Sequence, residues 1–168
     1  MQHKIIYRNS IPKGKEYDVA ILATNADVRK DLVKDLLKKS NCKFLILEKV
    51  AFQNSKDFEE ILNLAKLKAV DIRVNCPRRM NPLFNKLKKE LKDQTVEITV
   101  SGNDWGLGSN FIHMLDLLVF LTGEETFFVD SIKLENKIFE SKRPSFFEFK
   151  GEIVIKTSKG NYLSVKDS

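Results

Sequence analysis

The sequence has few of the residues that mark metal centres, disulfide scaffolds and membrane spans. Only two cysteines and two histidines occur among its 168 residues, and Cys42 and Cys76 lie far apart without metal-ligand spacing. Reduced thiols are therefore expected, rather than a disulfide, a zinc site or a cysteine nucleophile. No apolar run approaches the ~18 residues that cross a bilayer, and the N-terminal segment lacks the apolar middle of a secretory signal. We expect a soluble, globular, cytoplasmic protein without a membrane partner.

Two glycine-centred catalytic motifs are also missing. No serine or cysteine lies in a G-x-S-x-G context, so a hydrolytic triad is not indicated. A dinucleotide-binding sheet normally begins with a G-x-G-x-x-G turn after its first strand, and that turn is absent. The only G-x-G is Gly106-Leu107-Gly108, which follows a predicted strand and opens a helix, but Phe111 takes the third glycine position. This turn is a weak candidate for a phosphate cradle.

The chain has fewer acidic residues than basic ones, 23 against 29, and its net charge is +6. The densest basic run spans residues 78–92, which invites a nucleic-acid interpretation. Its lysines, however, alternate with apolar residues at helical spacing, as in a helix with one packed and one solvated face. Because no nucleic-acid module is recognisable, we favour a solvated face and expect no nucleic-acid partner.

The first half of the chain alternates predicted strands with predicted helices. Short apolar runs typical of buried strands lie at 18–24, 43–49 and 69–76. Apolar stripes at helical spacing lie between them, at 26–40 and 55–66, where Ser55 fits an N-cap. This alternation predicts right-handed crossovers and a parallel sheet, hence an α/β domain over residues 1–76.

The pattern changes after residue 93. A predicted strand at 94–103 precedes a helix at 110–123, and the rest of the chain is rich in phenylalanine and isoleucine with turn-like breaks. We predict a mostly antiparallel sheet over residues 77–168, in which the phenylalanines pack one sheet face against helices. The fold class is therefore α/β followed by α+β, with a buried helix in the second domain.

The helix NFIHMLDLLVFLTG carries three polar residues, Asn110, His113 and Asp116, spaced three apart among apolar ones. Such a helix is expected to be buried almost all round, so these side chains need partners. They are either satisfied structural residues, the interpretation we favour for His113, or the wall of a wet pocket. A metal site is not expected, because His3 is the only other histidine and metals usually take three or four protein ligands.

Polar residues also follow two of the predicted strands. Glu48 and Lys49 end the strand at 43–49, and Thr24 and Asn25 hold the equivalent position in the preceding strand. Ligands of open α/β sheets bind at this carboxyl edge. The alternative is that a strand simply ends in a solvated charged pair.

Four blocks of the sequence resemble the Gfo/Idh/MocA family, which includes glucose–fructose oxidoreductase and inositol dehydrogenase. The blocks are DVAILATN, LEKV, VNCPRRMNPLFNKLKKEL and GNDWGLGSNFIHMLDLLVFLTG, in that order over residues 18–123. The resemblance implies an oxidoreductase that uses NAD or NADP to transfer hydride at a hydroxyl of a sugar or nucleotide-sugar substrate. It also implies a role in sugar metabolism, such as polysaccharide biosynthesis, and a dimer formed through the antiparallel sheet.

The resemblance assigns roles to individual residues. Lys49 and His113 match the catalytic lysine and histidine, through which the hydroxyl proton leaves. The cofactor-binding positions that it implies are Thr24, Asn25, Glu48 and Lys49. Asn110 matches a substrate-pocket asparagine, and Arg79 falls in the block that shapes the pocket floor.

Three departures from the family pattern matter. Val50 stands where the family's E-K-P block has proline, which is expected to loosen the turn after Lys49. Ser109 replaces the acid that many members carry four residues before the histidine, which removes a proton acceptor. The resemblance also begins partway through the cofactor domain, without the first βαβ unit, and stops partway through the second sheet. The chain therefore resembles the middle of a family protein, with a partial Rossmann-like sheet.

These departures change the expected function. Without the Gly-rich turn the pyrophosphate loses its main anion site, so we expect weak or absent NAD(P) binding by this chain alone. A parallel sheet without its first strands leaves an apolar edge and uncovered faces, so we expect a homo-oligomer. Whether the chain is itself an enzyme stays open at this stage. The alternative is a non-catalytic association module derived from such an oxidoreductase.

Overall fold

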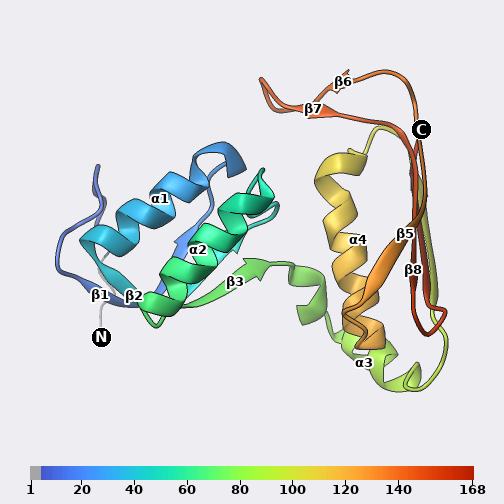
Figure 1. Cartoon of the computed structure of the whole chain (residues 1–168), viewed down its shortest axis with the longest axis horizontal. Coiled ribbons are helices and arrows are strands. Elements are labelled where there is room, and N and C mark those ends of the chain that lie inside the picture. The colour runs from blue at the N-terminus through green and yellow to red at the C-terminus, as the bar shows by residue number, and fades with distance from the viewer. Residues whose placement is uncertain (1–4) are drawn as a thin grey trace. The chain divides into compact units, whose positions relative to one another are not determined.

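The chain folds into two compact units, which a computed structural model describes over residues 5–168 (Figure 1). The first unit is Met1–Asn75 and the second is Cys76–Ser168. The predicted fold class, α/β followed by α+β, is confirmed. Within the described residues, no helix combines the length and apolar character needed to cross a membrane.

The first unit is a three-stranded parallel sheet with two crossover helices. Its elements in chain order are β1 (Glu16–Leu22), α1 (Ala26–Lys39), β2 (Asn41–Glu48), α2 (Ser55–Leu67) and β3 (Asp71–Asn75). The strand order is β1-β2-β3, and Leu22 pairs in register with Leu47. Asn54, rather than the predicted Ser55, is the N-cap of α2, and its side chain accepts a hydrogen bond from Lys56 N at 2.9 Å. Consecutive right-handed crossovers place both helices on one face of the sheet, as Figure 1 shows.

The covered face of this sheet holds the core of the first unit. Leu45 and Leu47 of β2 are fully buried against Val33 and Leu37 of α1 and Ile61 of α2. These residues are the apolar stripes that predict the helices, so the helical period and the strand run meet in one core.

The opposite face of the sheet carries apolar side chains that the described residues of the first unit leave largely exposed. Val19 and Ile21 of β1 are 50% and 63% exposed, and Phe44 of β2, the register partner of Val19, is 46% exposed. Parallel sheets are normally covered on both faces. This surface, Val19, Ile21 and Phe44, is called the open sheet face below.

The second unit combines a mixed four-stranded sheet with helices. It begins with the short 3-10 helix η1 (Pro77–Met80), α3 (Pro82–Glu90), β4 (Glu97–Gly102) and α4 (Leu107–Thr122). The remaining strands are β5 (Phe127–Leu134), β6 (Phe139–Glu140), β7 (Phe147–Glu148), β8 (Gly151–Thr157) and β9 (Tyr162–Asp167). The sheet order is β4-β9-β8-β5, parallel between β4 and β9 and antiparallel elsewhere, while β6 and β7 pair separately. The prediction of a mostly antiparallel sheet is confirmed.

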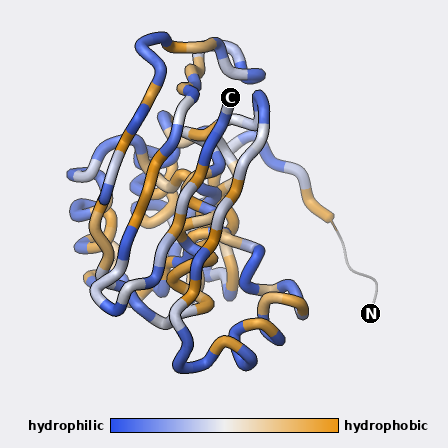
Figure 2. The backbone as a smooth tube through the Cα atoms, turned by 90° about the vertical axis from the view of Figure 1, so that its right-hand side faces the viewer, coloured by the Kyte–Doolittle hydropathy of each residue, from blue (hydrophilic) through white to orange (hydrophobic). Residues whose placement is uncertain are grey.

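The core of the second unit lies between α4 and the two central strands. Ile153 and Ile155 of β8 and Leu163 and Val165 of β9 pack with Leu118 of α4. Hydrophobic and hydrophilic residues are interspersed along the strands of this unit, as Figure 2 shows. In both central strands three consecutive residues are buried, 153–155 in β8 and 163–165 in β9, so burial there does not follow a simple period of two.

The prediction that the phenylalanines fill this core is wrong for several of them. Phe127 and Phe128 of β5 are 40% and 52% exposed, and Phe147 of β7 is 66% exposed. The reason is the strand order: β5 is an edge strand of the sheet whereas α4 packs on β9, and β7 pairs with β6 outside this sheet. Aromatic residues at strand spacing predicted the strand, but not its place in the sheet.

A buried carboxylate ties the end of α4 to the turn between β8 and β9. Glu124, which follows the C-cap Gly123, is 7% exposed and accepts a hydrogen bond from Asn161 Nδ2 at 2.8 Å. Hydrogen bonds from Thr157, and then from Asn161, hold the pKa of the Glu124 carboxyl below its ordinary value despite its burial. Its ionised form is therefore part of the folded state.

This contact predicts an acid-dependent loss of stability. The lowered pKa means that Glu124 stabilises the fold at any pH above its ordinary pKa, and that this contribution is lost as the pH falls through the lowered value. Urea unfolding from about pH 7 to about pH 3 should show a flatter pH dependence for Glu124→Gln than for the wild type. The exposed neighbour Glu125 gives the control variant, Glu125→Gln, and equal slopes for all three proteins would contradict the prediction.

Candidate functional site

In the first unit, the predicted cofactor residues lie together at the carboxyl ends of two neighbouring parallel strands. Thr24 and Asn25 follow β1, and Glu48 and Lys49 end and follow β2. Because Leu22 lies opposite Leu47, Thr24 falls at the level of Lys49 along the sheet. Glu48 Oε1 accepts a hydrogen bond from Asn75 Nδ2 of β3 at 2.7 Å. The sheet thus presents polar groups from all three strands at one edge.

A buried guanidinium joins the two loops at this edge. Arg29 of α1 is 1% exposed and donates to Val50 O at 2.5 Å and to Ala51 O at 2.8 Å. It also donates to Thr24 O in the loop after β1. Hydrogen bonds from a charged donor in a buried place are among the stronger ones in proteins. Arg29 therefore connects the loop that holds Thr24 to the loop that follows Lys49.

Arg29 is not among the predicted site residues, although its position in the sequence marks it as unusual. Arg29 lies four and seven residues before Val33 and Leu36, on the face of α1 that packs into the core. A charged residue at such a position must find partners when it is buried. The periodicity that located the core was thus sufficient to flag this residue as unusual.

The turn after Lys49 is held more firmly than the loss of proline suggests. The Lys49–Val50 peptide bond is cis. Ala51 and Phe52 are 3% and 4% exposed, and the carbonyls of Val50 and Ala51 both accept from Arg29. Burial and hydrogen bonds therefore hold the turn that the sequence analysis expected to be loose.

In the second unit, the three polar residues of α4 have different environments. Six residues of the helix are buried and all of its other residues are partly buried, so none is fully exposed. Asn110 Nδ2 donates to Trp105 O at 2.6 Å and to Gly106 O at 3.1 Å, so its amide fixes the loop that precedes the helix. Its amide nitrogen is thus engaged by this loop, and its substrate role stays a prediction.

Asp116 and Arg79 form a bidentate pair, which explains the last polar residue of the stripe. Arg79 Nε and Nη2 lie 2.8 Å and 2.5 Å from the Asp116 carboxylate, and the hydrogen bond to Asp116 raises the pKa of the Arg79 guanidinium. Arg79 also lies over the Phe120 ring at 5.7 Å, and Lys88 Nζ of α3 lies over the same ring at 4.4 Å. Arg79, predicted to shape a pocket floor, thus ties η1 to α4.

His113, the predicted catalytic histidine, lies on the buried face of α4 and is 8% exposed. The other histidine, His3, lies outside the described residues. Across residues 5–168, no group of three or more histidine, cysteine or acidic side chains is arranged to hold a metal ion. Cys42 and Cys76 are not part of a disulfide, and burial raises the pKa of the Cys42 thiol.

The glycine turn before α4 is not an open phosphate cradle. The Asp167 carboxylate accepts from Gly106 N at 3.0 Å, and Glu148 Oε2 accepts from Ser109 N at 3.3 Å. A Cβ on Gly106 or Gly108 would lie 2.9 Å from a Glu148 oxygen. The glycines therefore admit the protein's own carboxylates to the helix N-terminus, where they take the place of an external anion. The weak phosphate-cradle interpretation of this turn is wrong.

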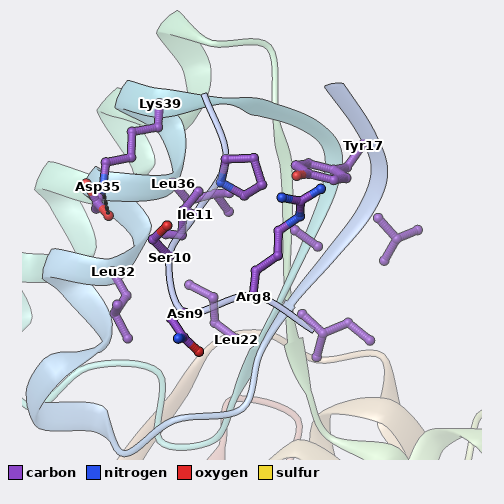
Figure 3. Close-up of a pocket in the computed structure, with 14 residues that line it drawn as sticks. Arg8, Asn9, Ser10, Ile11, Tyr17, Leu22, Leu32, Asp35, Leu36 and Lys39 are labelled. Carbon is purple, nitrogen blue, oxygen red and sulfur yellow. Dashed lines mark hydrogen bonds and ion pairs between the residues drawn. The ribbon is translucent and has the colours of Figure 1, made fainter. Parts of the chain in front are cut away.

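A separate hollow of about 650 Å³ lies beside β1 in the first unit (Figure 3). It is bounded by residues 8–12 of the N-terminal segment, by β1 and by the second half of α1. Arg8 extends toward the Tyr17 ring, and Asp35 and Lys39 form an ion pair at 2.7 Å on the opposite wall. None of the predicted cofactor residues lines this hollow, so it does not coincide with the strand-end site.

Comparisons with solved structures show which proteins share this fold. The dehydrogenase MviM from Clostridium difficile aligns with a TM-score of 0.69 at 16% identity, over 89% of this chain and 49% of its own. An NAD-binding protein from Listeria innocua aligns with a TM-score of 0.62 at 20% identity, over 90% of this chain and 47% of its own. No protein-family model and no curated protein sequence matches the chain.

The fold is also shared by a protein that is described as a repressor. A super-repressor mutant of Gal80p from Saccharomyces cerevisiae aligns with a TM-score of 0.71 at 16% identity, over 90% of this chain and 50% of its own. The chain therefore spans about half the length of the structures it matches. The predicted resemblance to Gfo/Idh/MocA-type oxidoreductases is confirmed at the level of the fold.

The closed N-terminus of α4 predicts the effect of removing its buried carboxylate. Asp167 is 2% exposed and receives hydrogen bonds from Gly106 N and Trp105 N, so Asp167→Ala should lower the free energy of unfolding by about 1–2 kcal/mol. Urea unfolding with and without inorganic phosphate measures this loss. Phosphate should stabilise the variant more than the wild type, because only the variant has unpaired N–H groups there.

The control for this measurement is Lys166→Ala, an exposed neighbour on β9. Equal stabilisation of wild type and Asp167→Ala by phosphate would show that the carboxylate does not occupy the anion position.

Proposed function

We propose that this chain forms the nicotinamide- and substrate-binding part of an NAD(P)-dependent oxidoreductase that acts on a hydroxyl of a sugar or nucleotide-sugar. The observation that carries the proposal is the meeting of Thr24, Asn25, Glu48 and Lys49 at the carboxyl edge of a parallel sheet. That edge is where open α/β sheets bind ligands. The fold shared with a dehydrogenase and an NAD-binding protein supports it. The substrate class rests on the resemblance of the sequence blocks.

The residues of the strand-end site suit the nicotinamide end of a dinucleotide. Bound NAD(P) would supply the hydride acceptor or donor. The Glu48 carboxylate, held by Asn75, can accept hydrogen bonds from ribose hydroxyls. The Lys49 amine can exchange a proton with a substrate hydroxyl. His113, the second catalytic residue that the resemblance implies, belongs to the second unit, and its role stays a prediction. The two loops that Arg29 joins would orient the nicotinamide end of the cofactor.

The same residues do not suit the pyrophosphate. The loop after β1 has the sequence ATNA, with no glycine to let backbone N–H groups approach a phosphate. Among the helices of residues 5–168, only α4 has glycines at its N-terminus, and that end is taken by Asp167 and Glu148. Affinity for the whole dinucleotide is therefore expected to be low, because the main anion contact is not provided by these residues.

A titration of the 168-residue chain with NADH and NADPH tests this function. We expect binding with a Kd of about 1 mM, which corresponds to a binding free energy of about −4 kcal/mol. The change in nicotinamide fluorescence measures this binding. Lys49→Ala should abolish the signal without changing the melting temperature, whereas Lys43→Ala should leave it intact. Lys43 is the matched control because it is an exposed lysine of β2 paired with Asp18 at 2.7 Å.

Two results would contradict the proposal. Equal binding by wild type and Lys49→Ala would place the cofactor elsewhere, and a lower melting temperature of Lys49→Ala would give the lysine a structural role. Micromolar binding by the wild type would instead show that the chain completes a phosphate site, and would favour a functional enzyme.

A second candidate function is a non-catalytic association module, formed by copies of this chain. The observation that favours it is the open sheet face, where Val19, Ile21 and Phe44 expose 46–63% of their surface on a face that parallel sheets normally cover. Contiguous exposed apolar side chains mark interaction surfaces. The shared fold of Gal80p, described as a repressor mutant, shows that the architecture is not confined to proteins named as enzymes.

Light scattering at micromolar concentration tests association. We expect a dimer or larger homo-oligomer, and Ile21→Lys should shift the mass toward the monomer because a charge on the open sheet face opposes its burial. The control is Leu67→Lys at the end of α2, an apolar residue that is 85% exposed and lies outside that face. A monomeric mass for the wild type would exclude this function.

A further inference from the structure

We propose that Arg29 is a positioning residue that locks the two strand-end loops of the first unit into one rigid cofactor-facing edge. The inference rests on the proposed function in one respect: it assumes that Thr24, Asn25, Glu48 and Lys49 serve the same ligand. Its structural part, the coupling of the two loops, stands on contacts within the first unit alone.

The geometry of the guanidinium is what allows this coupling. Arg29 Nη1 donates to Val50 O at 2.5 Å and to Ala51 O at 2.8 Å, while Nη2 donates to Thr24 O. The two nitrogens of one planar group thus reach loops that are more than twenty residues apart in the sequence. A lysine amine is a single point donor and lacks this fixed fork.

The three acceptors are backbone carbonyls of the loops themselves. A carbonyl of Thr24 and carbonyls of the two residues after Lys49 are fixed directly, so the backbone next to each candidate residue is held at short range. Because the guanidinium is 1% exposed, water cannot replace it without opening the core around α1. A local change at one loop must therefore be transmitted to the other.

Arg29 also provides a physical account of Val50. Proline restricts the backbone by its ring, and valine does not. Hydrogen bonds to the carbonyls of Val50 and Ala51, together with the burial of Ala51 and Phe52, restrain the same segment from outside. We infer that the arginine supplies, through side-chain contacts, the restraint that the sequence lacks at position 50.

Hydrogen–deuterium exchange of the full 168-residue chain tests the coupling of the two loops by Arg29 without any ligand. Arg29→Lys and Arg29→Met should each speed amide exchange in residues 23–25 and 49–52 by at least about tenfold, the factor expected for losing a charged hydrogen bond. Exchange in the interior of β2, residues 43–47, should stay within about twofold of wild type, since opening of the loops is local. The control Lys30→Met removes the adjacent ion pair to Asp57, at 2.8 Å, and should leave both loops unchanged.

Cofactor titration of the same variants gives the second readout. If the wild type binds NADH, Arg29→Lys should raise the Kd by at least about tenfold, because the charge remains but the fork is lost. If the wild type binds neither NADH nor NADPH, the proposed function fails. The exchange data then still show whether Arg29 couples the two loops.

Two exchange results would overturn the inference. If the loop amides of Arg29→Lys exchange at the wild-type rate, a positive charge alone is sufficient to hold the two loops. Faster exchange throughout α1 and β2, with a lower melting temperature, would show that Arg29 supports the core as a whole rather than the two loops.

Discussion

Buried polar groups at the ends of secondary-structure elements are the constraint on which the rest of this structure depends. Every helix and strand leaves unpaired backbone groups at its ends, and a buried end must find partners. In the first unit Arg29 satisfies the carbonyls beyond β1 and β2. In the second unit Asp167 satisfies the N–H groups before α4, and Glu124 links its other end to the β8–β9 turn. Arg29 thus fixes the loops that carry Thr24 and Lys49, and the two carboxylates fix the ends of α4, the helix that carries Asn110 and His113.

The regular elements were predictable because they follow local periodicity. The apolar runs and stripes of residues 18–76 predict the three parallel strands and both helices, and they do so without knowledge of any neighbour. The edge position of β5 was not predictable, because strand order is set by contacts between distant segments. The parallel pairing of β4 with β9 joins residues 97–102 to residues 162–167, and no local pattern encodes that choice.

The candidate site divides in the same way. Thr24, Asn25, Glu48 and Lys49 were found because polar residues at strand ends stand out from apolar runs, and the parallel register brings them to one edge. The partners that hold them were missed, because Arg29 and Asn75 acquire their roles only through the packing of α1 and β3 against β2. The stripe of α4 shows the limit of spacing arguments. Three residues with one period have separate environments, and Asp116 is explained by Arg79 of η1.

The departures from the family pattern carry different weight once the contacts are known. Val50 removes a restraint that hydrogen bonds from Arg29 provide by another route, so the turn after Lys49 does not depend on proline. Ser109 is different: its backbone N–H binds Glu148, and the carboxylate that closes the helix N-terminus comes from β7. A side chain on Gly106 or Gly108 would collide with that same carboxylate. The first unit thus retains a restrained strand-end site, whereas in the second unit the one glycine turn that resembles a phosphate cradle serves the fold.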